Sequence, residues 1–297
     1  MLFNVCALYI KIMNNENQTI HKSDDNLTIY GWNEKLNQLK QESIYSALAH
    51  GRVSIVHRTC YEVISGNGLF QCELTGNMMY GKSDDELPCT GDWVIFQPFD
   101  EHKGIIVDSL PRERTLYRKK SGTVADKQAI ASYVDKAFIV QSLDDNFNVR
   151  RVERFMVQIM EENISSVLVL NKADLDFDRQ SVEEQIKHIS SQIPVFFTSI
   201  HQLETIVRLR KSISEGETVV FVGSSGVGKS SLVNALCEKP VLLTSDISLS
   251  TGKGRHTSTR REMVLMDSSG VLIDTPGVRE FGLAIDNPYS LAEVLEI

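Results

Sequence analysis

The sequence predicts a small all-β barrel followed by an α/β domain built on a parallel sheet. Between residues 51 and 107, short apolar runs are separated by glycine, asparagine and proline, which is typical of small barrels. From residue 136 onward, strand-like apolar runs alternate with segments of helical periodicity, which indicates a parallel sheet covered on both faces. The length of 297 residues fits two such domains.

The composition is that of an ordinary soluble globular chain, with 42% hydrophobic residues and a formal net charge of −8. It excludes a disordered chain, a collagen and a small disulfide scaffold. The acidic balance disfavours non-specific nucleic-acid binding but allows a local basic face. The five cysteines form no CxxC pair, so neither a zinc site nor a disulfide framework is predicted, and a reducing cytoplasm fits best. Residues 1–13 are too short and too polar to span a bilayer, so no membrane partner is expected.

Residues 1–47 are predicted to form a polar extension and a helix at 32–48, and residues 48–110 to form the barrel. The five expected strands are 52–57, 61–64, 69–74, 93–97 and 104–108. Another small antiparallel β-domain would fit the same pattern. Trp93 and the other aromatic residues of this region are expected in its core rather than stacked on bases.

Residues 111–130 are predicted to be a basic connector, and residues 131–297 to be the α/β domain. The connector either contacts phosphate groups or is a solvated face; its cations are Arg112, Arg114, Arg118, Lys119 and Lys120. In the α/β domain, strands are expected at 136–141, 166–170, 194–198 and 217–222, and helices at 149–162, 181–191 and 203–213.

The string GSSGVGKS at residues 223–230 matches the phosphate-loop pattern GxxxxGK[ST] and lies between a predicted strand and an apolar-periodic segment. Its backbone N–H groups would point at phosphate oxygens, Lys229 would reach the β- and γ-phosphates, and Ser230 would ligate Mg²⁺. Such a string has about a 1% chance of occurring in a chain of this length. The residues expected to bind nucleotide here are Gly223, Ser224, Ser225, Gly226, Val227, Gly228, Lys229, Ser230 and Ser231.

The string Asn171-Lys172-Ala173-Asp174 follows the predicted strand 166–170 and indicates that the base is guanine. A carboxylate at Asp174 can accept both the N1–H and the exocyclic amine of guanine, whereas adenine would leave it unsatisfied. Asn171 is expected to brace the loop and the stem of Lys172 to cover the ring. Ser199, after the strand 194–198, is expected to support the guanine O6 through a backbone N–H.

Asp274 and Gly277 form a DxxG string after an apolar run at 271–273. Such a string is expected about once by chance, but at the end of a strand beside the phosphate loop Asp274 would hold Mg²⁺ and Gly277 would sense the γ-phosphate. Asn171 precedes Gly223 by 52 residues (223 − 171), which reverses the usual order of these motifs. The sequence therefore predicts a circularly permuted P-loop GTPase domain.

Together the motifs resemble the circularly permuted ribosome small-subunit-dependent GTPases, the RsgA/YjeQ family. The likeness covers about residues 31–280 and includes residues 31–32, 91–93, 148–155, 171–174, 223–231, 252–257 and 274–277. It implies an OB-fold as the barrel, GTP hydrolysis stimulated by the small ribosomal subunit and its rRNA, and a role in late maturation of that subunit. GTP or GDP and Mg²⁺ are the expected ligands. The family's C-terminal cysteine/histidine zinc module is not matched, because no cysteine follows Cys237, so zinc is not expected.

Val278 stands where a conventional GTPase has its water-orienting glutamine, so slow intrinsic hydrolysis is expected. The resemblance implies that His256 takes this catalytic role beside Lys229; alternatively His256 contacts RNA or solvent. Thr257 is expected to close on Mg²⁺, with Thr259 as the alternative. Two other functions remain open: a nucleotide kinase, and an RNA-binding module with little GTPase activity. A monomer is expected.

Overall fold

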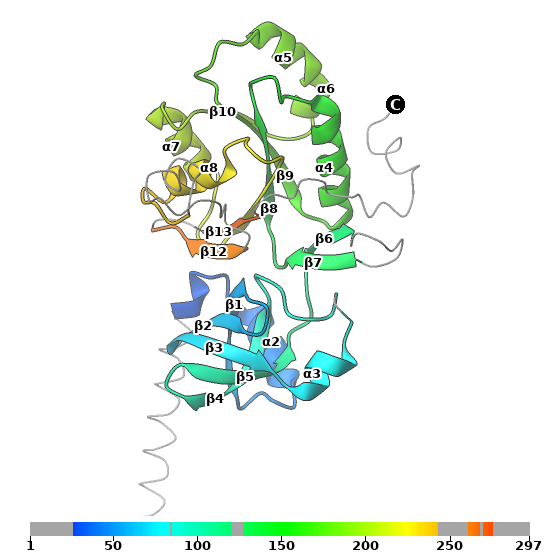
Figure 1. Ribbon diagram of the computed structural model, residues 1–297, viewed down its shortest axis with the longest axis vertical. Coiled ribbons are helices and arrows are strands. Elements are labelled where there is room, and N and C mark those ends of the chain that lie inside the picture. The colour runs from blue at the N-terminus through cyan, green and yellow to red at the C-terminus, as the bar shows by residue number, and fades with distance from the viewer. Residues whose placement is uncertain (1–25, 84, 120–126, 243–260, 268–269, 276–297) are drawn as a thin grey trace, which may run out of the picture.

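The computed structural model describes residues 26–83, 85–119, 127–242, 261–267 and 270–275, and contains a barrel and an α/β domain joined by a short linker (Figure 1). Among the described helices, none is long and apolar enough to cross a membrane.

The barrel is a closed five-stranded sheet, which confirms the predicted OB-like fold. Its strands are β1 (Ala49–Val56), β2 (Tyr61–Ser65), β3 (Gly68–Leu74), β4 (Trp93–Asp100) and β5 (Lys103–Ser109). The strand β1 pairs with both β2 and β4, β4 pairs with β5, and β5 runs parallel to β3, which closes the circle. Helix α3 (Gly76–Gly81) lies between β3 and β4 in the chain and contributes Met78 to the barrel core. Trp93 is 1% exposed, so it is not on a base-stacking surface, but it belongs to a second hydrophobic cluster with Trp32 and Leu36 and not to the core inside the barrel.

Helix α2 (Glu34–Glu42) is shorter than the predicted 32–48. Asn33 caps its start by accepting the Leu36 N–H at 3.1 Å. At the other end Lys40 Nζ donates to the Ser46 carbonyl at 2.9 Å, and residues 43–48 form turns. Local hydrogen bonds therefore replace the last helical turns, while Trp32 and Leu36 pack against Trp93 on the outside of the barrel.

The α/β domain has a six-stranded sheet in the order β10-β9-β8-β11-β13-β12, in which only β12 is antiparallel to its neighbour. The strands are β8 (Lys136–Ser142), β9 (Ser165–Asn171), β10 (Val195–Thr198), β11 (Thr218–Val222), β12 (Glu262–Leu265) and β13 (Val271–Asp274). The helices are α4 (Val149–Glu161), α5 (Arg179–Gln185), α6 (Lys187–Ser190), α7 (Leu203–Lys211) and α8 (Lys229–Leu236). Helices α4, α5 and α6 share one core with one face of the sheet, and α7 and α8 share a second core with the other face. The predicted helix at 181–191 is thus two helices that meet at the buried Ile186.

The linker contains a two-stranded sheet of β6 (Leu116–Lys119) and β7 (Lys127–Ala131), which packs on the α/β core through Leu116 and Ile130. Three of its cations have partners within the described residues. Arg112 donates to both carboxylate oxygens of the buried Asp92, at 2.9 and 2.7 Å. Arg114 pairs with Asp135, and Arg118 donates to Gln128. Lys120 lies outside the described residues.

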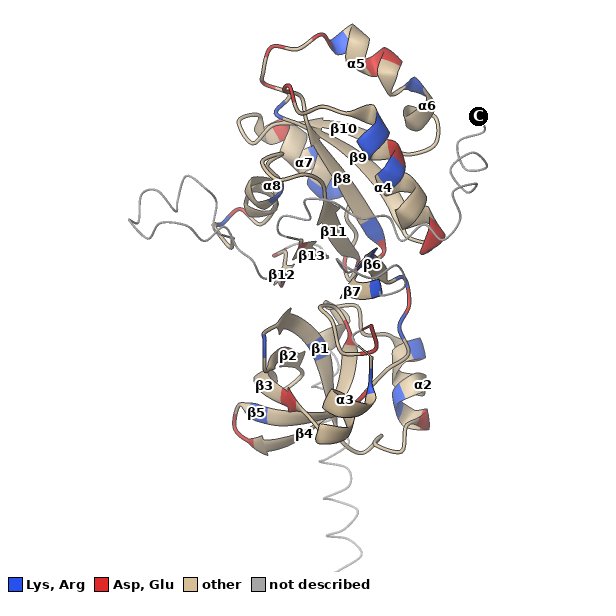
Figure 2. Cartoon of the chain, turned by 45° about the vertical axis from the view of Figure 1, so that its right-hand side comes forward, with Lys and Arg blue, Asp and Glu red and all other residues tan. Residues whose placement is uncertain are grey.

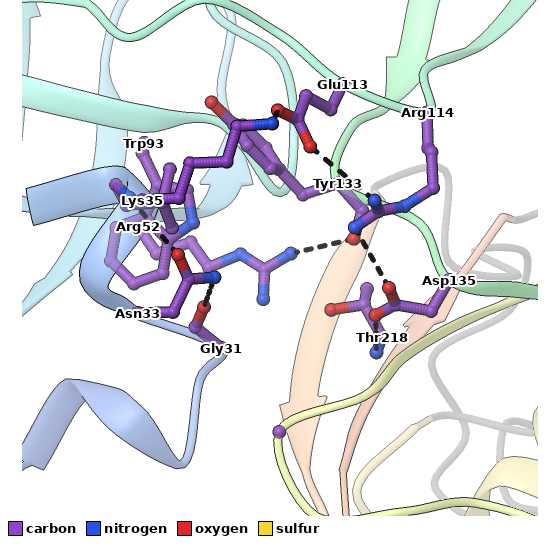
Figure 3. Close-up of a pocket in the computed structure, with 12 residues that line it drawn as sticks. Gly31, Asn33, Lys35, Arg52, Trp93, Glu113, Arg114, Tyr133, Asp135 and Thr218 are labelled. Atoms are coloured by element: carbon purple, nitrogen blue, oxygen red, sulfur yellow. Dashed lines mark hydrogen bonds and ion pairs between the residues drawn. The ribbon is translucent and has the colours of Figure 1, made fainter. Parts of the chain in front are cut away.

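The two domains meet where β1 of the barrel pairs with β12 of the α/β domain, through Ile55 and Glu262. Beside this contact lies a pocket lined by both domains and by the linker (Figure 3). One of its two arginines, Arg52, is 1% exposed, and the Arg52 guanidinium donates to the backbone carbonyls of Gly91, Tyr30 and Tyr133. These bonds connect the barrel to the segment before it, at Tyr30, and to the segment after it, at Tyr133, so Arg52 stabilises the junction.

Candidate nucleotide-binding site

The predicted motifs converge at the carboxyl edge of the parallel sheet, the edge at which open α/β sheets bind ligands (Figure 1). Strand β9 ends at Asn171, β10 at Thr198, β11 at Val222 and β13 at Asp274. The polar groups that follow these strands lie far apart in the chain, and the sheet order brings them together.

The phosphate loop connects β11 to α8 and needs glycine at two positions for steric reasons. Gly223 and Gly228 have φ of +149° and +93°. A Cβ at Gly223 would lie 2.3 Å from the Val140 carbonyl oxygen, and one at Gly228 would lie 2.4 Å from the Asn171 side-chain nitrogen. The loop is therefore packed against β8 and the guanine loop so closely that no side chain fits.

Lys229 is the buried cation of this loop. It is 7% exposed, and its Nζ donates to the carbonyl oxygens of Gly223 at 2.9 Å and Ser224 at 2.8 Å. Burial lowers the pKa of Lys229, and the charge of Asp274 partly offsets that effect. Lys229 also begins α8, whose Gly228 cap provides no side-chain acceptor. The loop thus joins a positive charge to a helix N-terminus, which suits phosphate oxygens.

Asp274 and Ser230 form a pair of oxygen donors beside Lys229. Ser230 Oγ donates to Asp274 Oδ2 at 2.9 Å. Asp274 is 1% exposed, and its other oxygen, Oδ1, is buried with no hydrogen-bond partner among the described residues. Burial raises the pKa of Asp274, against the opposing effects of Ser230 and Lys229. A buried carboxylate oxygen with no donor fits Mg²⁺, which prefers carboxylate and hydroxyl oxygens or waters that these groups hold.

Asn171 joins the guanine loop to the phosphate loop. Its side-chain amide donates to the Val227 carbonyl at 2.8 Å, and its side-chain oxygen accepts from Thr198 Oγ1 at 3.3 Å. Asn171 is 3% exposed. One buried side chain therefore connects the ends of β9 and β10 with the middle of the phosphate loop.

Asp174 is exposed, and its carboxylate is oriented by one bond from Ser199 Oγ to Oδ1. This bond lowers the pKa of Asp174 and keeps the carboxylate charged. The backbone N–H of Ser199, which is predicted to support the guanine O6, donates to Thr205 Oγ1 at 3.0 Å in this structure. Ser199 reaches the site through its hydroxyl group.

Lys172 is held by a residue that the sequence motifs missed. Its Nζ lies 2.8 Å from the Oδ2 atom of Asp144, which follows β8. Thr205, which accepts from the Ser199 N–H, was missed as well, and the bond from Thr198 to Asn171 was not predicted. The one sequence signal that could have indicated Asp144 is its position two residues after the end of β8.

The remaining predicted residues fall into two groups. Within the phosphate loop, Val227 is buried, Ser224 and Ser231 are half-buried, and Ser225 and Gly226 are exposed. Three predicted residues lie outside the described residues: the catalytic candidate His256, the Mg²⁺-binding candidate Thr257 and the γ-phosphate contact Gly277. In the described part of the chain, no cluster of three or more His, Cys, Asp or Glu residues could hold a metal ion.

Comparison with known proteins shows which family carries this set of nucleotide-binding motifs. The family model described as RsgA GTPase matches residues 109–284. The chain belongs to the RsgA GTPase family. It is 72% identical, over 96% of its length and 78% of the relative's, to "Small ribosomal subunit biogenesis GTPase RsgA 1" of Bacteroides thetaiotaomicron. It is 36% identical, over 91% of its length and 74% of the relative's, to the RsgA of Methanosarcina acetivorans.

Solved structures show the same fold. The structure of YjeQ from Thermotoga maritima matches with a TM-score of 0.59 and 24% identity, over 79% of this chain and 77% of that one. The structure of YloQ, described as a circularly permuted GTPase, matches with a TM-score of 0.58 and 19% identity, over 86% and 80%. These likenesses confirm the predicted circular permutation, and membership of the RsgA family confirms that the chain is a GTP hydrolase.

Proposed function

We propose that this chain hydrolyses GTP in step with late maturation of the small ribosomal subunit, and that binding to the subunit and its rRNA stimulates hydrolysis. The observation that carries the nucleotide part is the Asn171 amide bonded to the Val227 carbonyl, because it fixes the distance between the base-reading and phosphate-binding loops. The names of the RsgA relatives support the ribosomal part.

The geometry assigns separate tasks to the described residues. Asp174 would read the N1–H and the amine of guanine, with Ser199 holding its carboxylate in place. Lys229 would exchange its two loop carbonyls for β- and γ-phosphate oxygens. Ser230 and Asp274 would hold Mg²⁺, which supplies positive charge to the phosphates when bound.

These side chains stabilise charge and do not orient the attacking water. Lys229 is a donor only, and Ser230 and Asp274 are assigned to Mg²⁺ in this proposal. Val278 cannot form a hydrogen bond, so the water-orienting group belongs to another part of the chain or to the subunit. We propose His256 for this role, Thr257 as a further Mg²⁺ ligand and Gly277 as the contact to the γ-phosphate.

The test is phosphate release from GTP with and without purified small subunits. Turnover should be slow in the free protein and rise when subunits are added. His256→Ala should lose most of the stimulated rate, by about 10²–10⁴-fold, while His256→Gln should retain more because glutamine can orient water. A rate unchanged by subunits would contradict the ribosomal role. Recovery of His256→Ala at excess subunits would assign His256 to RNA contact.

We further propose that the protein acts as a monomer in the reducing cytoplasm. Four cysteines in the described residues are free, and burial raises the pKa of Cys72 to about 12, so its thiol is protonated. Light scattering during gel filtration should give the mass of one chain, and twice that mass would contradict the proposal.

A further inference from the structure

Asp144 fixes the position of the lysine in the guanine loop. Lys172 Nζ lies 2.8 Å from Asp144 Oδ2, while Asp144 Oδ1 accepts from Ser142 Oγ at 2.6 Å and from the Asn146 N–H at 3.0 Å. Both oxygens of the carboxylate are engaged, so it is held in one orientation. Asp144 is therefore a rigid acceptor for a side chain that is otherwise long and mobile.

The backbones of the two loops are connected at the same place. Ser142 and Asn171 are paired where β8 and β9 end, and the Leu143 N–H donates to the Asn171 carbonyl at 2.9 Å. Lys172 itself has a φ of +61°, a conformation that non-glycine residues seldom adopt. The surrounding bonds hold Lys172 in that conformation, and the contact with Asp144 is part of this set.

The pair is charged at physiological pH. Burial raises the pKa of Asp144, but the hydrogen bonds from Lys172, Ser142 and Asn146 outweigh it and lower the pKa to about 2. The side chains of Asp144 and Lys172 are 31% and 36% exposed, so solvent weakens the attraction without separating the pair.

We propose that Asp144 is a positioning residue for guanine nucleotides, which holds Lys172 so that its aliphatic stem covers the face of the base. This inference rests on the proposed role of the guanine loop. A lysine that is ordered before the nucleotide arrives loses less rotamer freedom on binding. Because GDP and GTP carry the same base, Asp144 should affect the affinity for both equally and leave the turnover of bound GTP unchanged.

The primary test is the dissociation constant for GDP in Asp144→Asn. Asparagine keeps the shape and can still accept from Ser142, but it removes the charge that holds Lys172. We expect about twofold to fivefold weaker GDP and GTP binding, faster GDP release and an unchanged kcat at saturating GTP. The matched control is Asp145→Asn, the same change of charge at the exposed neighbouring residue, which should bind GDP as the wild type does.

A double-mutant cycle with Lys172→Ala separates positioning from a general effect on the loop. Asp144→Asn should have no further effect on GDP affinity once Lys172 is removed. An equal loss in both backgrounds, or no loss in either, would overturn the role of Asp144. Thermal unfolding without nucleotide shows whether Asp144→Asn is folded. Comparing GDP with ADP on the wild type tests the guanine loop itself, because equal affinities would refute the proposed function and not only the role of Asp144.

Discussion

Both edges of the parallel sheet carry charged side chains, but a fully buried carboxylate that keeps one oxygen without a hydrogen-bond partner among the described residues is found at the carboxyl edge. At the carboxyl edge, Asp274 Oδ1 has no partner among the described residues, and Lys229 donates to two carbonyl oxygens of its own loop. At the amino edge, Asp135 accepts both the Thr218 N–H at 2.8 Å and Arg114 at 2.9 Å, and Lys136 pairs with Glu217 at 2.8 Å. Figure 2 colours the charged residues on the described part of the ribbon, and both acidic and basic residues occur toward each end of the α/β domain, so charge alone does not distinguish the two edges.

The difference separates binding from architecture. Groups with unused donors or acceptors mark the edge where a ligand completes the structure. Other charged groups satisfy one another, and one such pair, Asp92 of the barrel with Arg112 of the linker, connects these two parts of the chain. Substitutions at the carboxyl edge should therefore change function at little cost in stability, and those near the junction should do the reverse.

The largest effect is expected for Lys229→Ala. It removes the cation that would stabilise charge on the transferred phosphate, so the subunit-stimulated kcat should fall by about 10²–10³-fold. The melting temperature without nucleotide should change little, because both described hydrogen bonds of the lysine are to its own loop. Undiminished hydrolysis, measured as phosphate release, would show that the loop does not bind the reacting phosphates.

Asp92→Ala should lower the stability of the protein and leave its affinity for nucleotide nearly unchanged. Asp92 is fully buried and accepts from Arg112 and from the Cys89 N–H at 2.7 Å, so its loss leaves a largely buried guanidinium without its carboxylate. Breaking such a pair costs roughly 3 kcal/mol in the free energy of unfolding, which urea denaturation would measure. GDP affinity should stay within about twofold at temperatures where the protein is folded. Alanine at the exposed Glu73 of the same barrel is the control and should cost less than about 0.5 kcal/mol.

Asp174→Asn tests base recognition at the carboxyl edge. The asparagine amide can donate to the 2-oxo group of xanthine but no longer accepts from both guanine N–H groups. GDP affinity should fall by about tenfold or more while XDP affinity rises, in competition against a fluorescent nucleotide. A variant that retains the preference for GDP would show that another residue reads the base.

The smallest effect is expected for Asp274→Asn, which should raise the stability of the nucleotide-free protein while it weakens the Mg²⁺ site. The folded-state pKa of Asp274 is raised above its unfolded value, mainly by burial, so the charged form destabilises the folded protein increasingly as pH rises through that pKa. Removing the charge should stabilise the nucleotide-free protein at pH 7 by roughly 1 kcal/mol, and the gain should shrink on acidification toward pH 4. The same variant should lose the Mg²⁺-dependent increase in GTP affinity. Destabilisation at pH 7 would mean that the carboxylate is satisfied by groups other than Ser230.

Sequence reasoning identified the motif-bearing strands because their signals are local. The phosphate loop follows β11 directly, and the guanine string follows β9, so apolar runs and turn residues located both. Local signals were weaker for helices that end by tertiary contact. The predicted helix at 32–48 stops at Glu42, and the one at 181–191 is divided at Ile186, because a buried side chain and nearby carbonyl acceptors outweigh helix propensity there.

The sequence by itself determined the kinds of group that this protein places at its sheet edge, the order of its motifs and hence the circular permutation. Only the tertiary structure decided which groups meet. Lys172 and Asp144 are 28 residues apart, Asn171 and Val227 are 56 apart, and Asp92 and Arg112 are joined across the barrel and the linker. The physical reason is that motif geometry depends on bonds between chain neighbours, whereas these pairings depend on strand order and register, which the packing of both cores sets.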